Sequence, residues 1–251
     1  MKTLINGSNG MAGSPDAPRS QIAQKVLFFC GILASLVWFG TDILAALHYK
    51  GYSYPFDPIS DLTAIGSPTR PFVVPLLGFY LGLKIVFALG IWISTGQKHD
   101  LRITAGLLFA FGLTDFVSFF FPWHPAEPVG MYINLMHSIL AGGITVLLIL
   151  LTIGFGASAG GKWFRIYSYG TLLVMIVMGT LPLLGGIQIG TDQPPEWFGA
   201  GERINAYGFM LWLVMLAIVL LRIQPKNPNA QDRKRLVNPG GVTNLKPRGR
   251  N

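Results

Sequence analysis

The sequence predicts an all-α, polytopic membrane protein, a helix bundle with six transmembrane helices, and three observations support this fold class. Only 12% of the 251 residues are Asp, Glu, Lys or Arg, which is about half the share usual in soluble domains. Hydrophobic residues make up 51% of the chain, and the mean hydropathy is +0.49. Six apolar runs are each long enough to cross about 30 Å of hydrocarbon as a helix. These observations exclude an ordinary soluble domain.

The apolar runs occupy residues 26–47, 71–93, 101–121, 131–154, 167–184 and 204–223. Helices are expected because unpaired backbone groups are costly in lipid, and because barrel strands would appear as alternating segments of about ten residues. The domain organisation follows directly. Residues 1–24 form a flexible cytoplasmic lead, residues 25–223 the transmembrane domain, and residues 224–251 a basic tail that is expected to be disordered.

The residues at the ends of the runs fit this assignment in chain order. The first run follows a lead rich in Gly, Ser, Asn and Pro and is expected to be a retained anchor. Prolines stand near the start of the second run and at the end of the third, where the missing amide donor is easily tolerated. Trp123, Trp163 and Trp197 lie before the fourth, fifth and sixth runs, as expected for the aromatic belt of a membrane interface.

The loop charges predict the orientation, because Lys and Arg are retained on the cytoplasmic side during insertion. If both termini are inside, only Lys50, Arg70 and Arg203 fall in the opposite loops. The chain is therefore predicted to lie in the cytoplasmic membrane with both termini in the cytoplasm. This topology accounts for the net charge of +8 without a nucleic-acid partner. The basic tail is expected either to be simply disordered or to contact anionic lipid headgroups.

Ionisable residues inside the apolar runs are the strongest functional signal, since each costs at least about 2.5 kcal/mol at the membrane centre. Four such residues away from the ends of the runs stand out, namely Asp42, Lys84, Asp115 and His137. At 1.5 Å of rise per residue, all but the lysine lie roughly 8 to 9 Å beneath the outer surface. The lysine lies deeper, and its long side chain can rise to pair with an aspartate.

These residues and the outer loops predict an outward-facing polar pocket that binds a lipid headgroup or a small polar ligand, with the lipid bilayer as the general partner. Its candidate residues are Asp42, Ser60, Asp61, Lys84, Asp115, His137, Glu202 and Arg203. The structural alternative is that the buried charges merely pair and fix helix register. For Ser60 and Asp61, the structural alternative is the cap of a short helix that begins at Leu62.

Four segments resemble a known family of prokaryotic membrane proteins. They are YSYPFDPISDLTAIGSPTRPF after the first run, Phe121-Pro122, Met136-His137-Ser138, and Gly201-Glu202-Arg203-Ile204. Together they are similar to the family called domain of unknown function 998, over about residues 25–223, with Ser60-Asp61-Leu62 as the most specific element. In that family an acidic residue commonly follows the Phe-Pro pair, whereas Trp123-His124 follows it here. The resemblance implies six helices and a polar outer-face site, and it implies no activity.

Two other functions remain open. In the first, His124, His137 and Asp115 bind zinc, and the chain is a metal-dependent hydrolase acting on a lipid, by analogy with membrane enzymes of the alkaline ceramidase type. The paired-histidine motif of those enzymes is missing. In the second, Asp115, Lys84 and His137 relay protons in a small-solute transporter, although no inverted repeat is evident. No catalytic residue is assigned.

Overall fold

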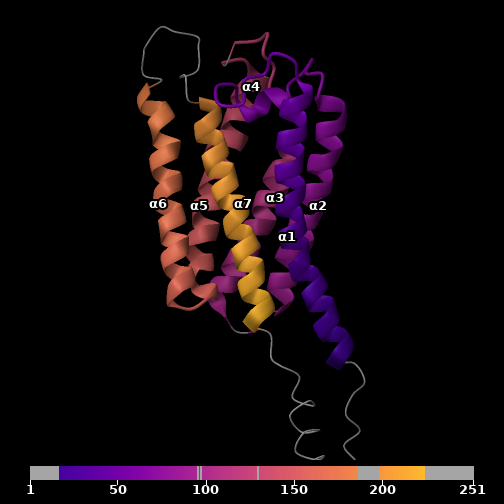
Figure 1. The fold of residues 1–251 in the computed structure, drawn as a ribbon, viewed down its shortest axis with the longest axis vertical. Coiled ribbons are helices and arrows are strands. Elements are labelled where there is room, and N and C mark those ends of the chain that lie inside the picture. The colour runs from indigo at the N-terminus through magenta and orange to yellow at the C-terminus, as the bar shows by residue number, and fades with distance from the viewer. Residues whose placement is uncertain (1–16, 95, 97, 129, 186–197, 224–251) are drawn as a thin grey trace, which may run out of the picture.

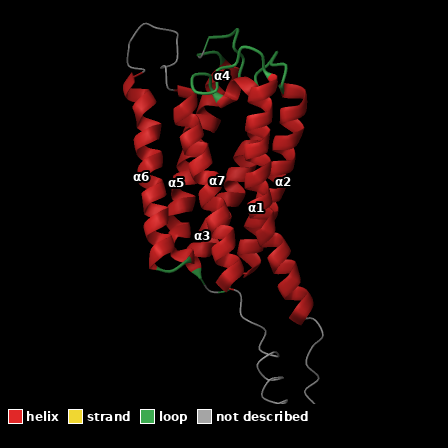
Figure 2. Ribbon diagram, in the orientation of Figure 1, coloured by secondary structure: helices red, strands yellow, loops and turns green. Residues whose placement is uncertain are grey.

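The computed structural model describes residues 17–94, 96, 98–128, 130–185 and 198–223, and over these ranges it is helical and contains no strand (Figures 1 and 2). The predicted all-α bundle is therefore confirmed. Most of the predicted lead, up to residue 16, lies outside the described residues, and so does the predicted basic tail, residues 224–251.

The helices follow the predicted runs in order. The long helices are α1 (Ala17–His48), α2 (Arg70–Ser94), α3 (His99–Ser118), α6 (Lys162–Gly185) and α7 (Phe198–Ile223). Between α3 and α6 one continuous helical segment combines α4 (Tyr132–His137), the π-helix η2 (Ser138–Ile144), α5 (Thr145–Gly156) and the short η3 (Ala157–Ala159). A single 3-10 turn, η1 (Ile59–Leu62), lies in the loop between α1 and α2.

Five of these segments are long and apolar enough to cross a membrane, judged over the described residues by length and composition. They are Gln21–His48, Arg70–Ser94, His99–Ser118, Tyr132–Ala159 and Phe198–Ile223. The remaining long helix, α6, coincides with the predicted fifth span and lies beside α5 and α7 (Figure 1). The chain is a multi-pass integral membrane protein.

Two boundaries differ from the predicted ones in a way that matters for the site. Helix α1 begins at Ala17, so the second part of the predicted lead is helical. Helix α7 begins at Phe198 rather than near residue 204, so Glu202 and Arg203 lie within the helix and not in the loop before it. Both charged side chains are thereby fixed to a rigid element.

The helices form a closed ring in the order α1, α2, α3, α5, α6 and α7, in which each packs against the next and α7 returns to α1 (Figure 1). Aromatic residues fill the interior of the ring. Phe111 of α3 meets Phe209 of α7 edge to face, with ring centroids 5.5 Å apart, and Phe209 stacks on the fully buried Trp212. The indole Nε1 of Trp212 donates a hydrogen bond to Ser168 Oγ on α6 at 2.9 Å.

The loop between α1 and α2 and the loop between α3 and α4 lie at one end of the bundle, whereas α1 begins and α7 ends at the opposite end (Figure 2). At the loop end the first turn of α7 is capped by the loop between α1 and α2. The amides of Gly199 and Ala200 donate to the carbonyls of Phe56 and Pro55, at 3.2 and 2.8 Å. These bonds satisfy amides that have no partner within the helix itself.

The contact between Gly199 and this loop predicts a specific cost of substitution. A Cβ at Gly199 would collide with the backbone carbonyl of Asp57, which cannot move away as a side-chain end can. We expect Gly199→Ala to destabilise the protein by about 1 to 3 kcal/mol. The matched control is Gly208→Ala, whose Cβ meets nothing closer than 3.8 Å. The control should be neutral or slightly stabilising, because alanine favours the helix.

The measurement is the unfolding of each purified variant in mixed micelles of mild detergent and SDS. If the two glycine substitutions changed the free energy of unfolding equally, the close contact between α7 and the loop between α1 and α2 would be contradicted.

Candidate functional site

A buried ion pair joins the first and the last helix near the loop end of the bundle. The guanidinium of Arg203 on α7 faces the carboxylate of Asp42 on α1, with Nε 3.3 Å from Oδ2 and Nη2 3.3 Å from Oδ1. Both side chains are buried, with exposed fractions of 4% and 2%. Such a two-point pairing fixes both the distance and the orientation of the two groups.

The remaining donors of Arg203 bind the loop between α1 and α2 and the first turn of α7. Its Nη1 donates to the carbonyls of Tyr54, Asp57 and Gly199 at 2.7, 3.1 and 3.3 Å, and its Nη2 donates to the Tyr52 hydroxyl at 2.5 Å. Burial raises the pKa of the Tyr52 hydroxyl, so Tyr52 stays protonated and in turn donates to backbone carbonyls of the same loop. Arg203 therefore connects α1, α7 and the loop in one network.

Two further tyrosines complete the coordination of the buried carboxylate. Tyr54 and Tyr207 both donate to Asp42 Oδ2, at 2.7 and 2.6 Å, and their hydroxyls also contact each other. The ring of Tyr54 lies 3.9 Å from the Arg203 guanidinium carbon, which adds a cation–π contact. We call Asp42, Tyr52, Tyr54, Arg203 and Tyr207 the Arg203 cluster. Protein groups satisfy its charges, so its geometry indicates a structural clamp.

The turn η1 is bound to α7 by Glu202, the residue directly before Arg203. Glu202 Oε2 accepts a hydrogen bond from the Ile59 amide at 2.7 Å, which holds the start of η1 against α7. Ser60 and Asp61 lie inside this turn. The predicted cap is wrong, because Pro58 precedes the turn and no side chain caps it. Burial, and then the charge of Asp57, raise the pKa of the Asp61 carboxyl.

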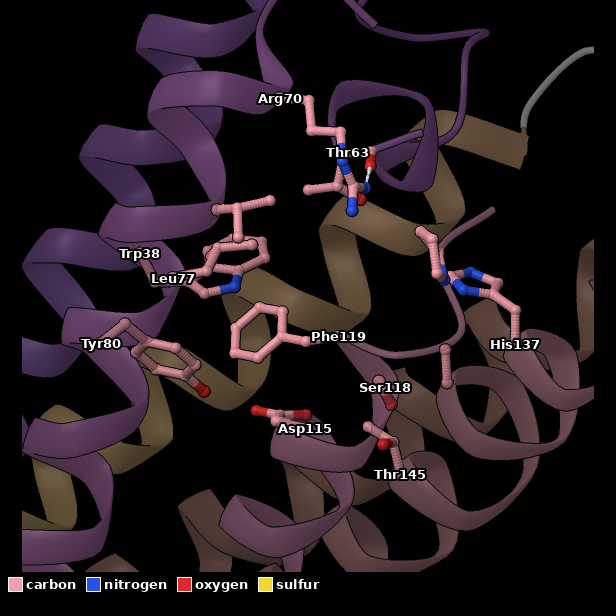
Figure 3. A pocket seen from close by; sticks show the side chains of 13 residues that line it. Trp38, Thr63, Arg70, Leu77, Tyr80, Asp115, Ser118, Phe119, His137 and Thr145 are labelled. Carbon is pink, nitrogen blue, oxygen red and sulfur yellow. Dashed lines mark hydrogen bonds between the residues drawn. The ribbon is translucent and has the colours of Figure 1, made fainter. Parts of the chain in front are cut away.

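A second set of polar side chains lines a cavity of about 180 Å³ inside the ring of helices, beneath η1 (Figure 3). Its walls come from α1, α2, α3 and the segment from α4 to α5. Apolar side chains contribute much of the surface, among them Trp38, Leu77 and Phe119. The polar side chains that line it are Thr63, Arg70, Tyr80, Asp115, Ser118, His137 and Thr145. We refer to this space as the cavity.

The floor of the cavity is an ion pair between Lys84 and Asp115. The ammonium of Lys84 binds Asp115 Oδ2 and lies 3.3 Å from the ring centroid of Phe111 and 4.7 Å from that of Tyr80. The Lys84 side chain is entirely buried, whereas a quarter of the Asp115 side chain is exposed. The predicted Asp–Lys pair thus forms with Asp115, because Asp42 is engaged by Arg203.

His137 and Arg70 approach the cavity from its side and from its roof (Figure 3). Nδ1 of His137 lies 3.0 Å from the Phe121 carbonyl, which can only accept, so Nδ1 carries the proton in this bond. The π-helix η2 begins directly after His137, and such insertions are frequent at functional sites. Arg70 is the first residue of α2, and its Nη1 donates to the Thr63 carbonyl.

One side chain that lines the cavity, Tyr80, has a buried hydroxyl without a described partner. The hydroxyl of Tyr80 is buried and forms no hydrogen bond with any described residue, although Tyr80 as a whole is only 4% exposed. In Figure 3 this hydroxyl points toward the carboxylate of Asp115. A buried hydroxyl without a partner costs about 1 to 3 kcal/mol, so this atom requires an explanation.

The predicted site residues therefore divide between two places. Asp115 and His137 line the cavity, with Lys84 at its floor, whereas Asp42 and Arg203 form the clamp. Trp38 separates the two places, because it lines the cavity while its ring packs edge to face against Tyr207 at 5.6 Å. Glu202, Ser60 and Asp61 belong to neither place directly; they hold or form the η1 turn above the cavity.

The proposed zinc ligands do not converge. His124 lies outside the cavity lining, and its Nε2 is 3.8 Å from Glu127. Within the described ranges, no group of three or more His, Cys, Asp or Glu side chains could hold a metal ion. The geometry therefore gives the zinc-hydrolase alternative no support.

Sequence reasoning missed Arg70 and the four tyrosines Tyr52, Tyr54, Tyr80 and Tyr207. Arg70 was counted only as a loop charge, although a cation at the first residue of a span after a Pro-rich loop could have identified it. Tyr80 and Tyr207 lie inside apolar runs, and Tyr52 and Tyr54 lie in the loop between the first two runs. Tyrosines are common at membrane interfaces, so the sequence carried no signal for the hydroxyls.

Fold and cavity together define a multi-pass integral membrane protein with a polar cavity at one end of a helical ring. The sequence model of the family described as "Protein of unknown function (DUF998)" matches residues 32–219, and the chain belongs to this family. The matched range includes the Arg203 cluster and all residues that line the cavity. Neither the search of curated proteins nor the search of solved structures found a match.

The clamp predicts a large cost for removing one of its charges. We expect Arg203→Met to destabilise the protein by about 3 to 5 kcal/mol, because it leaves Asp42 buried without a counter-charge. The matched control is Arg165→Met on the exposed start of α6, which should change stability by less than about 0.5 kcal/mol. Unfolding in mixed micelles measures both. A small effect at Arg203 would contradict the clamp.

The raised pKa of Asp61 predicts a pH-dependent gain on substitution. Its folded-state pKa lies above the unfolded value of 3.8, so ionisation of Asp61 opposes folding at neutral pH and this penalty disappears as the pH falls. We expect Asp61→Asn to raise the melting temperature at pH 7 by more than it does near pH 4. A shift of the same size at both pH values would argue against burial of this carboxyl.

Proposed function

We propose that this protein binds a lipid headgroup or a small polar molecule in the cavity. The observation that carries the proposal is the unsatisfied polarity of the cavity. Tyr80 offers a buried hydroxyl without a partner, and Asp115 Oδ1 accepts no hydrogen bond from a described residue. A ligand group that accepts from the Tyr80 hydroxyl recovers the free energy lost when this hydroxyl was removed from water, and the same group can donate to Asp115.

The size of the cavity supports a ligand of headgroup size. A volume of about 180 Å³ corresponds to roughly six water molecules at about 30 Å³ each. Sites for larger organic ligands usually begin at about 300 Å³. The cavity therefore suits the polar part of a lipid, or a free molecule of similar size, and not a whole lipid.

The mixture of side chains supports specific recognition. Trp38, Leu77 and Phe119 exclude water along one part of the wall, while the polar groups enter from the roof, the side and the floor (Figure 3). Few polar groups in an apolar surround are typical of small-molecule sites, because the low dielectric constant strengthens each contact.

The proposal includes a location. We infer that the protein lies in the cytoplasmic membrane with both termini in the cytoplasm and the cavity in the outer leaflet. The distribution of Lys and Arg over the loops supports this orientation. The start of α1 and the end of α7 at one end of the bundle, opposite the cavity, are consistent with it (Figure 2).

The test is a binding measurement on the detergent-purified full chain with two soluble headgroup probes, sn-glycerol 3-phosphate and phosphorylethanolamine. Leu77→Trp places a bulky indole ring in the cavity wall, where it takes up part of the cavity. The matched control Leu173→Trp adds the same indole ring on the exposed face of α6. We expect the wild type and the control to bind at least one probe in equilibrium dialysis, and Leu77→Trp to bind it more than tenfold more weakly.

Two results would overturn the proposal. The first is that neither probe binds the wild type. The second is that a probe binds the two tryptophan variants equally, because such binding would not use the cavity.

A further inference from the structure

We infer that the ligand of the cavity is a hydroxylated phosphate ester, with its phosphate at Arg70 and a hydroxyl group between Tyr80 and Asp115. This inference rests on the proposed function and specifies the class of ligand. The same chemistry occurs in a free molecule such as glycerol phosphate and in a glycerol-phosphate lipid headgroup. Three features of the cavity carry the argument, namely its floor, its roof and the distribution of its charges.

The floor offers one donor and one acceptor. The buried Tyr80 hydroxyl has no described partner, and Asp115, which lines the cavity, uses Oδ2 for Lys84 and keeps Oδ1 without a described partner. A ligand hydroxyl can accept from Tyr80 and donate to Asp115 at the same time. It therefore satisfies both atoms with a single group.

An ammonium group fits the floor less well. It has donors only, so the proton of the Tyr80 hydroxyl would remain without an acceptor. In addition, the ammonium of Lys84 already binds Asp115 and neutralises it, so a second cation at this carboxylate would be repelled. The floor thus selects a neutral hydroxyl over a cation.

The roof offers a cation without a counter-charge. Over the described residues, Arg70 forms no ion pair, and the single hydrogen bond of its side chain runs from Nη1 to the Thr63 carbonyl. The guanidinium has five N–H donors in a fork that matches the oxygens of an oxyanion. In Figure 3 it points down into the cavity, opposite the carboxylate of Asp115.

Phosphate is the oxyanion that the surroundings supply. Arg70 is the first residue of the membrane-crossing helix α2, so it lies near the level of the headgroups, where lipid phosphates are concentrated. A phosphate at Arg70 and a hydroxyl at the floor fit a cavity of about 180 Å³ when a short carbon chain joins them.

The experiment compares soluble probes that differ in one group. Sn-glycerol 3-phosphate carries both groups, ethyl phosphate lacks the hydroxyls, glycerate replaces the phosphate by a carboxylate, and phosphorylethanolamine carries an ammonium. We expect the wild-type chain to bind sn-glycerol 3-phosphate about tenfold more tightly than each of the other three in equilibrium dialysis.

Variants assign this preference to residues. Tyr80→Phe should weaken sn-glycerol 3-phosphate about tenfold and leave ethyl phosphate unchanged, because it removes only the donor at the floor. Without ligand this variant should be at least as thermally stable as the wild type, since it loses a buried hydroxyl without a partner. Tyr132→Phe is the matched control, as Tyr132 is exposed outside the cavity. Arg70→Lys, which keeps the charge but not the fork, should weaken every phosphate probe.

The source of the ligand is read with lipids. Nanodiscs that contain phosphatidylglycerol present the hydroxylated phosphate within the bilayer, and nanodiscs with phosphatidic acid lack the hydroxyls. If phosphatidylglycerol competes with soluble sn-glycerol 3-phosphate and phosphatidic acid does not, the ligand is a headgroup. If neither lipid competes, the ligand is a free phosphate ester.

The inference is overturned if ethyl phosphate, glycerate or phosphorylethanolamine binds as tightly as sn-glycerol 3-phosphate, or if Tyr80→Phe has no effect on the preference. Either result leaves the proposed function intact, provided that Leu77→Trp still blocks binding. If no probe binds the wild type, both this inference and the proposed function are overturned.

Discussion

The pairing of Arg203 with Asp42 is the interaction on which the loop end of this protein depends. It closes the ring of helices, because it joins α7 to α1. It also fixes the loop between α1 and α2, because other donors of Arg203 bind backbone carbonyls of that loop. Burying two charges is expensive and is tolerated only when further hydrogen bonds satisfy them. The tyrosine hydroxyls at Asp42 provide these bonds. The clamp is thus complete without any ligand.

The clamp also determines where the cavity has its roof. Glu202 is the neighbour of Arg203 on α7, so fixing Arg203 also fixes Glu202. The Glu202 carboxylate accepts a hydrogen bond from the amide of Ile59, the first residue of η1. At the other end of this short turn, Leu62 is buried against Ala45 and Val73, and its carbonyl accepts from Thr69 at 2.8 Å. The next residue, Thr63, contacts Arg70 and lines the cavity. The roof is therefore suspended between α7 and α2.

The sequence was sufficient for the helical bundle, but not for the direction in which its polar residues point. Length and hydropathy located the apolar runs because lipid forces every spanning segment to pair its own backbone. Helical rise placed Asp42, Asp115 and His137 at one depth, and Asp115 and His137 do line one cavity. Asp42 instead faces α7, where it pairs with Arg203. The sequence could not predict this direction, because depth along a helix says nothing about the side of the helix on which a residue lies.

Other features depended on contacts between distant segments. The start of α7 lies before residue 204 because the loop between α1 and α2 caps its first turn, and no local pattern announces a cap supplied by residues about 140 positions away. The hydropathy pattern also gives no sign of the π-helix η2. This π-helix changes the direction in which Thr145 points relative to His137, compared with a regular α-helix. Both residues line the cavity, although eight residues of regular α-helix would place the second about 80° around the helix from the first.

The two polar groups differ in one physical respect, and this difference separates structure from function. In the Arg203 cluster every charge is met by protein groups, so adding a ligand would require breaking bonds that hold the helices together. In the cavity the ion pair of Lys84 and Asp115 cancels its own charge at the floor, while Arg70 keeps an uncompensated charge at the roof and Tyr80 an unused hydroxyl. A bundle that needed only stability would gain from apolar residues at these positions. The cavity is therefore a part of the molecule where binding free energy is still available.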